Sequence, residues 1–372
     1  MKFFKWFFLV LVFLFIGACT VNNILATQGT EQIPSQSVYK DGKFYNIEPM
    51  APNSLSTFFG VLVRYFTETK IDAEPLQALP MRPISHELLA GLSDDTVHVF
   101  KLGHSSILLK VYGEYWLLDP VFSERASPFA FFGPKRFQQT PIDIEQLPQI
   151  DKVLISHNHY DHLDQMSVQK LADKTSQFFV PLGVGGDLNR WGVEKNKIKE
   201  FDWWQEQEIT HGFVAFTPTK HFSGRALNDG NKSLWGAWVI DVGKETLYFS
   251  GDSGYFSGFK EVGERYGPFD ITFIEVGAYD SQWPDVHMTP EQSVQAHRDL
   301  KGSVMMPIHN GTFDLAFHAW YEPLERVKVI ADNHNVKLHT PIVGEVTALN
   351  QSITSSPWWR VFMPKKYVAL AN

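Results

Sequence analysis

The stretch His157-Asn158-His159-Tyr160-Asp161-His162 directly follows the mostly apolar run 152–156, which is typical of a buried strand. Three imidazoles and one carboxylate therefore fall within six residues at the end of that strand. Imidazole nitrogens and carboxylate oxygens are ligands for Zn²⁺, Mn²⁺ or Fe. A polar loop with surface histidines is the alternative, but such tight spacing favours metal binding. The stretch therefore predicts a metal site at the edge of a sheet.

The pattern H-x-H-x-D-H resembles the signature of the metallo-β-lactamase-fold hydrolases, and this resemblance implies further ligands downstream. His221 closes an expected strand and loop over 213–220. Asp252 lies in a glycine-flanked turn after a strand, and His309 follows an expected strand over 303–308. These positions occur in the order that the family shows, each after an apolar run. Together with the first stretch they imply a set of seven ligands.

The resemblance implies two zinc ions per chain, with Mn or Fe as alternative metals. It divides the ligands as follows: His157, His159 and His221 for the first ion, Asp161, His162 and His309 for the second, and Asp252 for both. Paired ions of this kind lower the pKa of water to about 7 and neutralise charge on reacting oxygens. A structural zinc site closes its coordination with four ligands, often thiolates. A larger set without cysteine therefore indicates hydrolytic catalysis, with Asp252 in the catalytic group.

Length and composition indicate one large catalytic domain of the α/β class. The chain has 372 residues, of which 44% are hydrophobic, enough for a sizeable core. Three short strands are expected at 97–102, 107–111 and 115–118, and a helix at 290–300 with Thr289 as its N-cap. The resemblance implies that such elements form a four-layer αββα sandwich. The net charge of −8 argues against nucleic acid as a partner.

The N-terminus predicts export and attachment to a membrane. Two lysines precede an apolar run that ends in Ile16-Gly17-Ala18-Cys19, which resembles a bacterial lipobox. We therefore expect a signal peptide over 1–19, lipidation of Cys19, and a lipoprotein anchored at the outer membrane or the periplasmic face. An uncleaved N-terminal membrane anchor is the alternative. A tether and N-terminal extension over 20–90 would lead into a hydrolase domain at 91–350, followed by a C-terminal tail at 351–372.

Segments outside the ligands resemble the N-acylphosphatidylethanolamine-hydrolysing phospholipase D family. They lie between residues 97 and 313: Leu102–Ser106, Leu118–Pro128, Gly133–Phe137, Phe201–Trp204, Leu234–Trp238 and Ile308–Phe313. The resemblance implies a phosphodiesterase that cleaves N-acylated phospholipids to phosphatidic acid and N-acylethanolamine. The expected partner is thus a phospholipid substrate, and a homodimer is compatible with the sequence.

The same resemblance gives roles to three residues near the ligands. Tyr160 would reach the scissile phosphate or a nearby lipid group, and Arg225 would meet the anionic phosphate, for which a guanidinium is suited. His287 would bind the substrate as a positioning group or proton donor. Val286 stands where the family usually has an amide side chain, which leaves the headgroup preference open.

Further residues surround the expected site without binding metal. His104 and Asp119 are expected to orient the ligands through hydrogen bonds. The aromatic stretches 129–132 and 358–360 would line an acyl-chain channel, rest at a membrane interface, or simply belong to the core.

The sequence leaves two other functions open. The first is a lactonase, or a sugar-phosphate or cyclic-phosphodiester hydrolase, on the same fold. The second is an envelope lipoprotein that affects permeability without turnover. The shared carboxylate of Asp252 argues against the second, because a binding protein needs no such bridge between two open metal positions.

Overall fold

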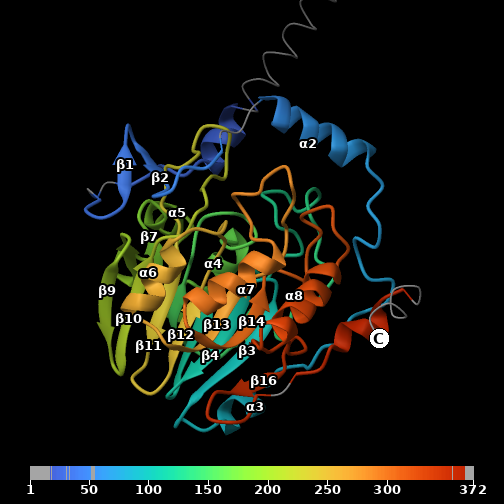
Figure 1. Ribbon diagram of the computed structural model, residues 1–372. Coiled ribbons are helices and arrows are strands. Elements are labelled where there is room, and N and C mark those ends of the chain that lie inside the picture. The colour runs from blue at the N-terminus through green and yellow to red at the C-terminus, as the bar shows by residue number, and fades with distance from the viewer. Residues whose placement is uncertain are drawn as a thin grey trace, which may run out of the picture.

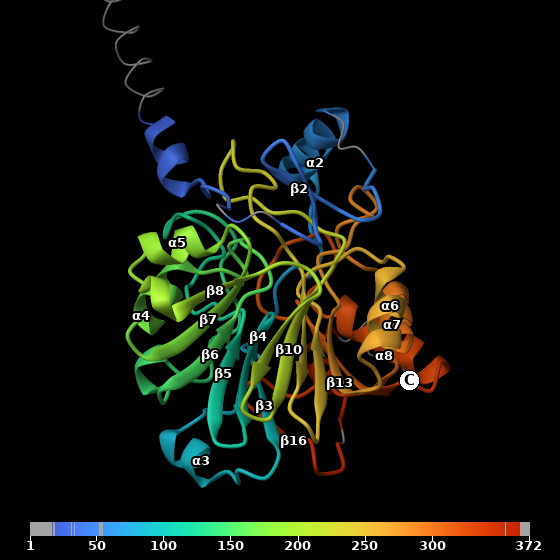
Figure 2. The same ribbon diagram turned by 90° about the vertical axis from the view of Figure 1, so that its left-hand side faces the viewer.

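The computed structural model describes Gly17, residues 19–30, Gln32, and residues 34–51, 55–353 and 355–364. Two seven-stranded sheets face each other in the centre, and helices cover their outer faces (Figures 1 and 2). The predicted four-layer αββα sandwich is therefore confirmed.

The first sheet has the strand order β16-β3-β4-β5-β6-β7-β8. Its strands are β3 (Val97–Gly103), β4 (Ser106–Val111), β5 (Glu114–Leu118), β6 (Ile150–Leu154), β7 (Thr175–Pro181), β8 (Ile198–Phe201) and β16 (Val346–Ala348). The first three form an antiparallel meander close to the predicted bounds, whereas β5 to β8 pair in parallel. The carboxyl ends of β5 to β8 therefore lie at one edge of the sheet.

The second sheet has the order β15-β14-β13-β12-β11-β10-β9. Its strands are β9 (Gln205–Ile209), β10 (Gly212–Thr217), β11 (Ala237–Asp241), β12 (Thr246–Phe249), β13 (Phe269–Glu275), β14 (Gly302–Ile308) and β15 (Lys337–Leu338). The strands β12 to β15 pair in parallel, so their carboxyl ends also share one edge.

Apolar side chains hold the layers together. Large aromatic residues such as Trp116, Phe201 and Trp238 fill the space between the sheets. The helices α4 (Gln165–Leu171) and α5 (Gly185–Arg190) pack on the outer face of the first sheet. On the second sheet the corresponding layer consists of α6 (Gly258–Arg265), α7 (Pro290–Asp299) and α8 (Glu322–Asn333). The short helices outside these layers are α3 (His86–Gly91), η1 (Ile144–Gln146), η2 (Lys195–Lys197) and η3 (Trp358–Phe362).

Local sequence explains where α7 begins. Thr289 accepts a hydrogen bond from the backbone of Gln292, the Gln292 side chain bonds back, and Pro290 occupies the first turn. This capping box satisfies two backbone donors that the helix itself leaves free. The predicted helix and its N-cap are confirmed.

The described part of the segment 20–90, which we expected to be a tether and N-terminal extension, is packed on the domain. Residues 19–25 are helical, and Ala26 and Thr27 are buried. The hairpin of β1 (Val38–Lys40) and β2 (Lys43–Tyr45) inserts Phe44 into the core between the sheets. Buried side chains thus dock this segment onto the domain, and α2 (Leu55–Thr67) follows as a helix near the sheet edge that carries the site (Figure 1).

The predicted signal peptide lies outside the described residues, apart from Gly17 and Cys19, and Cys19 is exposed. In the part of the chain that the structure describes, no helix has the length and apolar character needed to cross a bilayer. The described part of the predicted tail is packed rather than detached: Trp359 is fully buried and donates a hydrogen bond to Glu325.

Candidate metal centre

The predicted ligands come together because their loops all leave the same edge of the two sheets. The first stretch follows β6, and the turn that carries Asp252 follows β12. His221 lies a few residues beyond β10, and His309 follows β14 directly. The parallel pairing of β5 to β7 and of β12 to β14 aligns these carboxyl ends. The sandwich therefore brings all seven predicted ligands to one point.

Three imidazoles form one half of the cluster. Nδ1 of His159 lies 2.9 Å from Nε2 of His157 and 3.2 Å from Nε2 of His221. The carboxylate of Asp252 approaches from the side, with Oδ2 3.7 Å from Nε2 of His157 and 3.8 Å from Nε2 of His221. This is the group expected for the first ion.

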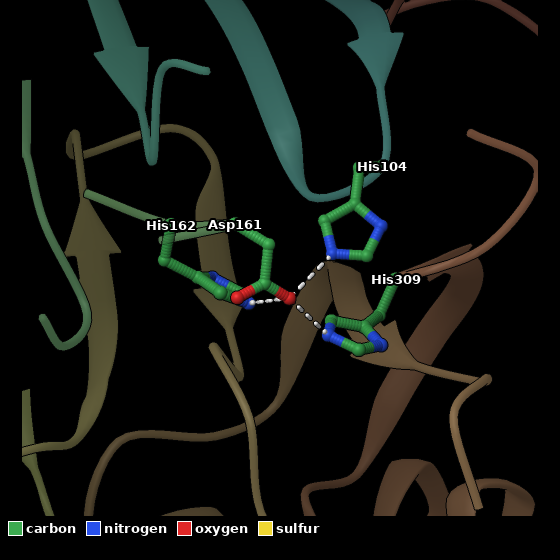
Figure 3. A group of neighbouring side chains, drawn as sticks. All are labelled: His104, Asp161, His162 and His309. Atoms are coloured by element: carbon green, nitrogen blue, oxygen red, sulfur yellow. Dashed lines mark hydrogen bonds and ion pairs between the residues drawn. The ribbon is translucent and has the colours of Figure 1, made fainter. Parts of the chain in front are cut away.

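The other half joins Asp161, His162 and His309. Oδ2 of Asp161 lies 3.2 Å from Nε2 of His309 and 3.6 Å from Nε2 of His162 (Figure 3). Asp252 faces this half too, at 3.1 Å from Nε2 of both histidines. A single carboxylate thus contacts both halves, as a bridging ligand must.

His104 lies closer to the cluster than expected. Its Nε2 is 3.1 Å from Oδ2 of Asp161, and Figure 3 draws it beside His309 around that oxygen. It belongs to a group with Asp161, His162 and His309 whose ligand atoms lie within 4.8 Å of one another. The hydrogen bond to Asp161 is the orienting role predicted for His104, and the short distances also qualify its imidazole as a candidate ligand.

Asp119 orients ligands from behind, as its motif predicted. Its Oδ2 accepts hydrogen bonds from Nδ1 of His162 at 2.7 Å and from Oγ of Ser156 at 2.5 Å, and its Oδ1 accepts from the Ser156 backbone. Oγ of Ser156 in turn lies 2.9 Å from Nδ1 of His157. These contacts direct Nε2 of both histidines into the cluster.

The electrostatics of the cluster fit divalent cations. Burial, reinforced by His162, holds the pKa of His157 well below its usual value, so this ring is a neutral ligand. Burial opposes protonation of His309, but Asp252 and Asp161 outweigh it and raise its pKa to about 10. Nε2 of His162 and Oδ1 of Asp252 are buried 3.1 Å apart, and neither has another hydrogen-bond partner among the described residues. A metal site requires buried nitrogen and oxygen atoms that are free to bind the ion, and nearby carboxylates that attract its positive charge.

A cavity of about 400 Å³ opens over the cluster, and His287 lies in its wall. Nδ1 of His287 is 2.9 Å from Oε2 of Glu275, whose other oxygen accepts from the Met288 backbone. Burial raises the pKa of Glu275, although His287 opposes this. The remaining wall is largely apolar and consists of Val61, Phe222, Ala278, Gln282, Trp283, Val286 and Leu315.

Tyr160 and Arg225 lie elsewhere than expected. Nη1 of the buried Arg225 donates to the backbone carbonyls of Asn158 and Leu163, both at 2.7 Å. Its guanidinium stacks on the Tyr160 ring, and the Tyr160 hydroxyl donates to the Arg225 carbonyl at 2.8 Å. Neither residue lines the cavity over the cluster. Both side chains brace the loop that carries the ligands, and both line a neighbouring cavity that shares Phe222 with the first. Their contact with the substrate phosphate stays a prediction.

Glu275 is a site residue that the sequence analysis did not predict. It ends β13 at the ligand edge, is fully buried, and forms a group with Asp252, His287 and His309. A lone carboxylate at the end of an apolar run, as in Thr272-Phe273-Ile274-Glu275, is the signal that could have found it.

A sandwich of two sheets with this cluster at one edge defines a metal-dependent hydrolase of the metallo-β-lactamase fold. Residues 115–310 match the beta-lactamase superfamily domain, and the chain belongs to this superfamily. A solved metallo hydrolase from the archaeon Ignicoccus hospitalis superposes with a TM-score of 0.53 at 21% identity, covering 68% of this chain and 98% of the other. That likeness supports the fold. Membership of this superfamily supports a metal-dependent hydrolase rather than a protein without turnover.

Two relatives have higher sequence identity to this chain than that solved structure has. An uncharacterized protein of Mycobacterium tuberculosis is 37% identical over 89% of each chain. The N-acyl-phosphatidylethanolamine-hydrolyzing phospholipase D 1 of Caenorhabditis elegans is 34% identical over 62% of this chain and 68% of that protein. The resemblance found in the sequence is therefore confirmed, and the chain is a homologue of this phospholipase.

Proposed function

We propose that this protein is a dinuclear zinc phosphodiesterase that hydrolyses N-acylphosphatidylethanolamine-like phospholipids to phosphatidic acid and N-acylethanolamine. The observation that carries the proposal is the position of Asp252 between two groups of ligands at the base of an apolar-walled cavity. The homology to a Caenorhabditis elegans phospholipase D of this specificity supports the substrate class.

The ligand set suits attack by water on a phosphodiester. Two zinc ions, when bound, would activate water and neutralise charge on the phosphoryl oxygens. His157, His159 and His221 would hold one ion, Asp161, His162 and His309 the other, and Asp252 both. The carboxylates of Asp161 and Asp252 would balance part of the positive charge of the two ions.

His287 is placed to serve the leaving group. With Nδ1 engaged by Glu275, its other ring nitrogen, Nε2, is the one left for the cavity. When water adds to phosphorus, the bond from phosphorus to the ethanolamide oxygen breaks and that oxygen needs a proton. We assign the delivery of this proton to Nε2 of His287, with Glu275 holding the ring in place.

Exposed apolar side chains lie on the segments that line a second cavity, and they fit a substrate that lies in a bilayer. Leu227 is 98% and Phe131 83% exposed, and Phe132 and Ile24 are exposed too. A second cavity, of about 770 Å³ and lined by Leu25, Phe129 and Leu227 among others, adjoins the first at Phe222. Large apolar patches rimming a site mark interaction with membranes or other apolar partners. We further propose that lipidation of Cys19 anchors the exported protein at the membrane that supplies its substrate.

The test is a panel assay on the zinc-loaded protein in mixed micelles. We expect turnover of N-acylphosphatidylethanolamine, with phosphatidylcholine, a medium-chain lactone and bis(p-nitrophenyl) phosphate as competing substrates. Asp252→Asn, which removes the charge shared by both ions, should lower kcat by a factor of about 100 or more. Rapid hydrolysis of the lactone without phospholipid turnover would assign the protein to the lactonase alternative.

A further inference from the structure

The side chain of Thr27 lies directly behind the metal-binding stretch, although the two are far apart in sequence. Thr27 is fully buried, and its hydroxyl donates to Oδ2 of Asp187 at 2.6 Å. The same hydroxyl accepts a hydrogen bond from Nδ2 of Asn158 at 3.0 Å. Asn158 is the residue between the ligands His157 and His159. A side chain from the N-terminal segment therefore touches the middle of the ligand motif.

Asn158 uses both ends of its side-chain amide and its backbone carbonyl to fix this motif. Its Oδ1 accepts from the Gly224 backbone at 2.8 Å, and its carbonyl accepts from Arg225. Nδ2 bonds to Thr27 and is buried with the rest of the residue. Loss of the Thr27 hydroxyl would leave this buried donor without its acceptor, which proteins avoid. The side chain would then have to turn, and the adjacent ligands would turn with it.

Thr27 also holds the loop that follows His221. Its backbone N–H donates to Oδ2 of Asp229 at 2.8 Å, and Asp229 accepts as well from the backbone of Arg225 and Ala226. One residue of the N-terminal segment is thus bonded to both pieces of chain that carry the three histidines of the first group. Figure 2 shows this segment lying against the end of the first sheet near α5, the helix that contains Asp187.

We propose that Thr27 is a positioning residue for the metal centre, through which the N-terminal segment sets the geometry of His157, His159 and His221. The segment is then part of the site rather than a spacer between membrane and enzyme. This inference rests on the metal site and not on the identity of the substrate, so it can fail or hold independently of the proposed phospholipase activity.

The test compares Thr27→Val, which keeps the shape but removes the hydroxyl, with Thr27→Ser, which keeps the hydroxyl. Thr30→Val is the matched control, because among the described residues the Thr30 hydroxyl bonds to the backbone of Gln32 nearby and to nothing at the site. The full chain in detergent is used for all variants. Amide hydrogen exchange over residues 156–163 is measured on the metal-free proteins, and zinc loss to a chelator and the visible spectrum of the Co²⁺ form on the loaded ones.

We expect Thr27→Val to exchange faster over 156–163, to release one of two zinc ions about tenfold faster, and to shift the Co²⁺ absorption bands. Thr27→Ser and Thr30→Val should behave like the unaltered protein. If Thr27→Val does not fold, Thr27→Ala replaces it as the variant without the hydroxyl and is compared with Thr27→Ser. Unchanged exchange, zinc release and Co²⁺ spectrum in the folded hydroxyl-free variant would overturn the proposal. So would equal changes in Thr27→Ser, because the hydroxyl would then not be the group responsible.

Discussion

Nδ1 of His162 lies 2.7 Å from Oδ2 of Asp119, and both side chains are fully buried. The carboxylate fixes which ring nitrogen of His162 carries the proton and leaves Nε2 for a metal ion. Asp119→Asn replaces one oxygen acceptor by an amide that cannot serve all its present donors. We expect a loss of about 10- to 100-fold in zinc affinity or activity, measured by competition with a chromophoric chelator. Asp151→Asn, on β6 away from the cluster, is the control, and equal affinities in both variants would contradict the assignment.

Gly251 allows the turn before Asp252 to pass close to the first sheet. Its φ is 52°, and a Cβ there would lie 2.5 Å from Cβ of Ser156. Gly251→Ala should therefore lower the free energy of unfolding by more than the roughly 1–2 kcal/mol that a left-handed conformation alone costs. Gly42→Ala provides the comparison, because Gly42 also has a positive φ but a Cβ there meets nothing within 4 Å. Urea unfolding should show the larger loss of unfolding free energy for Gly251→Ala. An equal loss in both variants would show that the contact with Ser156 adds no measurable cost.

Lys101 makes folding stability depend on pH. Burial lowers its pKa to about 7, and its amine donates to the carbonyl of Pro307 and to Oδ1 of Asn310. The unfolded chain has the ordinary lysine pKa near 10.4, so between pH 7 and 10 it binds more protons than the folded chain. The free energy of unfolding should therefore rise with pH, by about 2 kcal/mol from this residue between pH 7 and 9.

Lys101→Met removes this titration. The stability of the unaltered protein relative to the variant should then increase as the pH rises from 7 to 9, as measured by urea unfolding of the metal-free proteins. Parallel pH profiles would show that Lys101 stays charged in the folded state.

His287→Asn should slow turnover without emptying the metal site. Proton transfer by a positioned side chain contributes typically about 10²- to 10⁴-fold, so kcat should fall by that order while zinc content stays at the unaltered value. A substrate with a p-nitrophenolate leaving group needs no such proton and should lose much less. An equal loss for both substrates would assign His287 to substrate binding instead.

The sequence could predict that the seven candidate ligands meet, because each lies in a short motif that follows an apolar strand. Local pattern is enough there, since parallel strands deliver their ends to a common edge. Contacts that depend on distant segments could not be seen. Thr27 meets Asp187 and Asn158 only after the N-terminal segment has docked. Nη1 of Arg225 likewise donates to two backbone carbonyls that no motif indicates. The burial of the two aromatic stretches also depends on distant segments, so the sequence could not predict it. Phe131 is exposed, whereas Trp359 is buried.

The most direct test of the central claim is hydrolysis of N-acylphosphatidylethanolamine by the zinc-loaded protein in ¹⁸O-labelled water. Attack of water on phosphorus forms the new oxygen bond there and breaks the bond to the ethanolamide oxygen. Mass spectrometry should therefore find one label in phosphatidic acid and none in the N-acylethanolamine. A label in the N-acylethanolamine, or no cleavage of this phospholipid at all, would contradict the account.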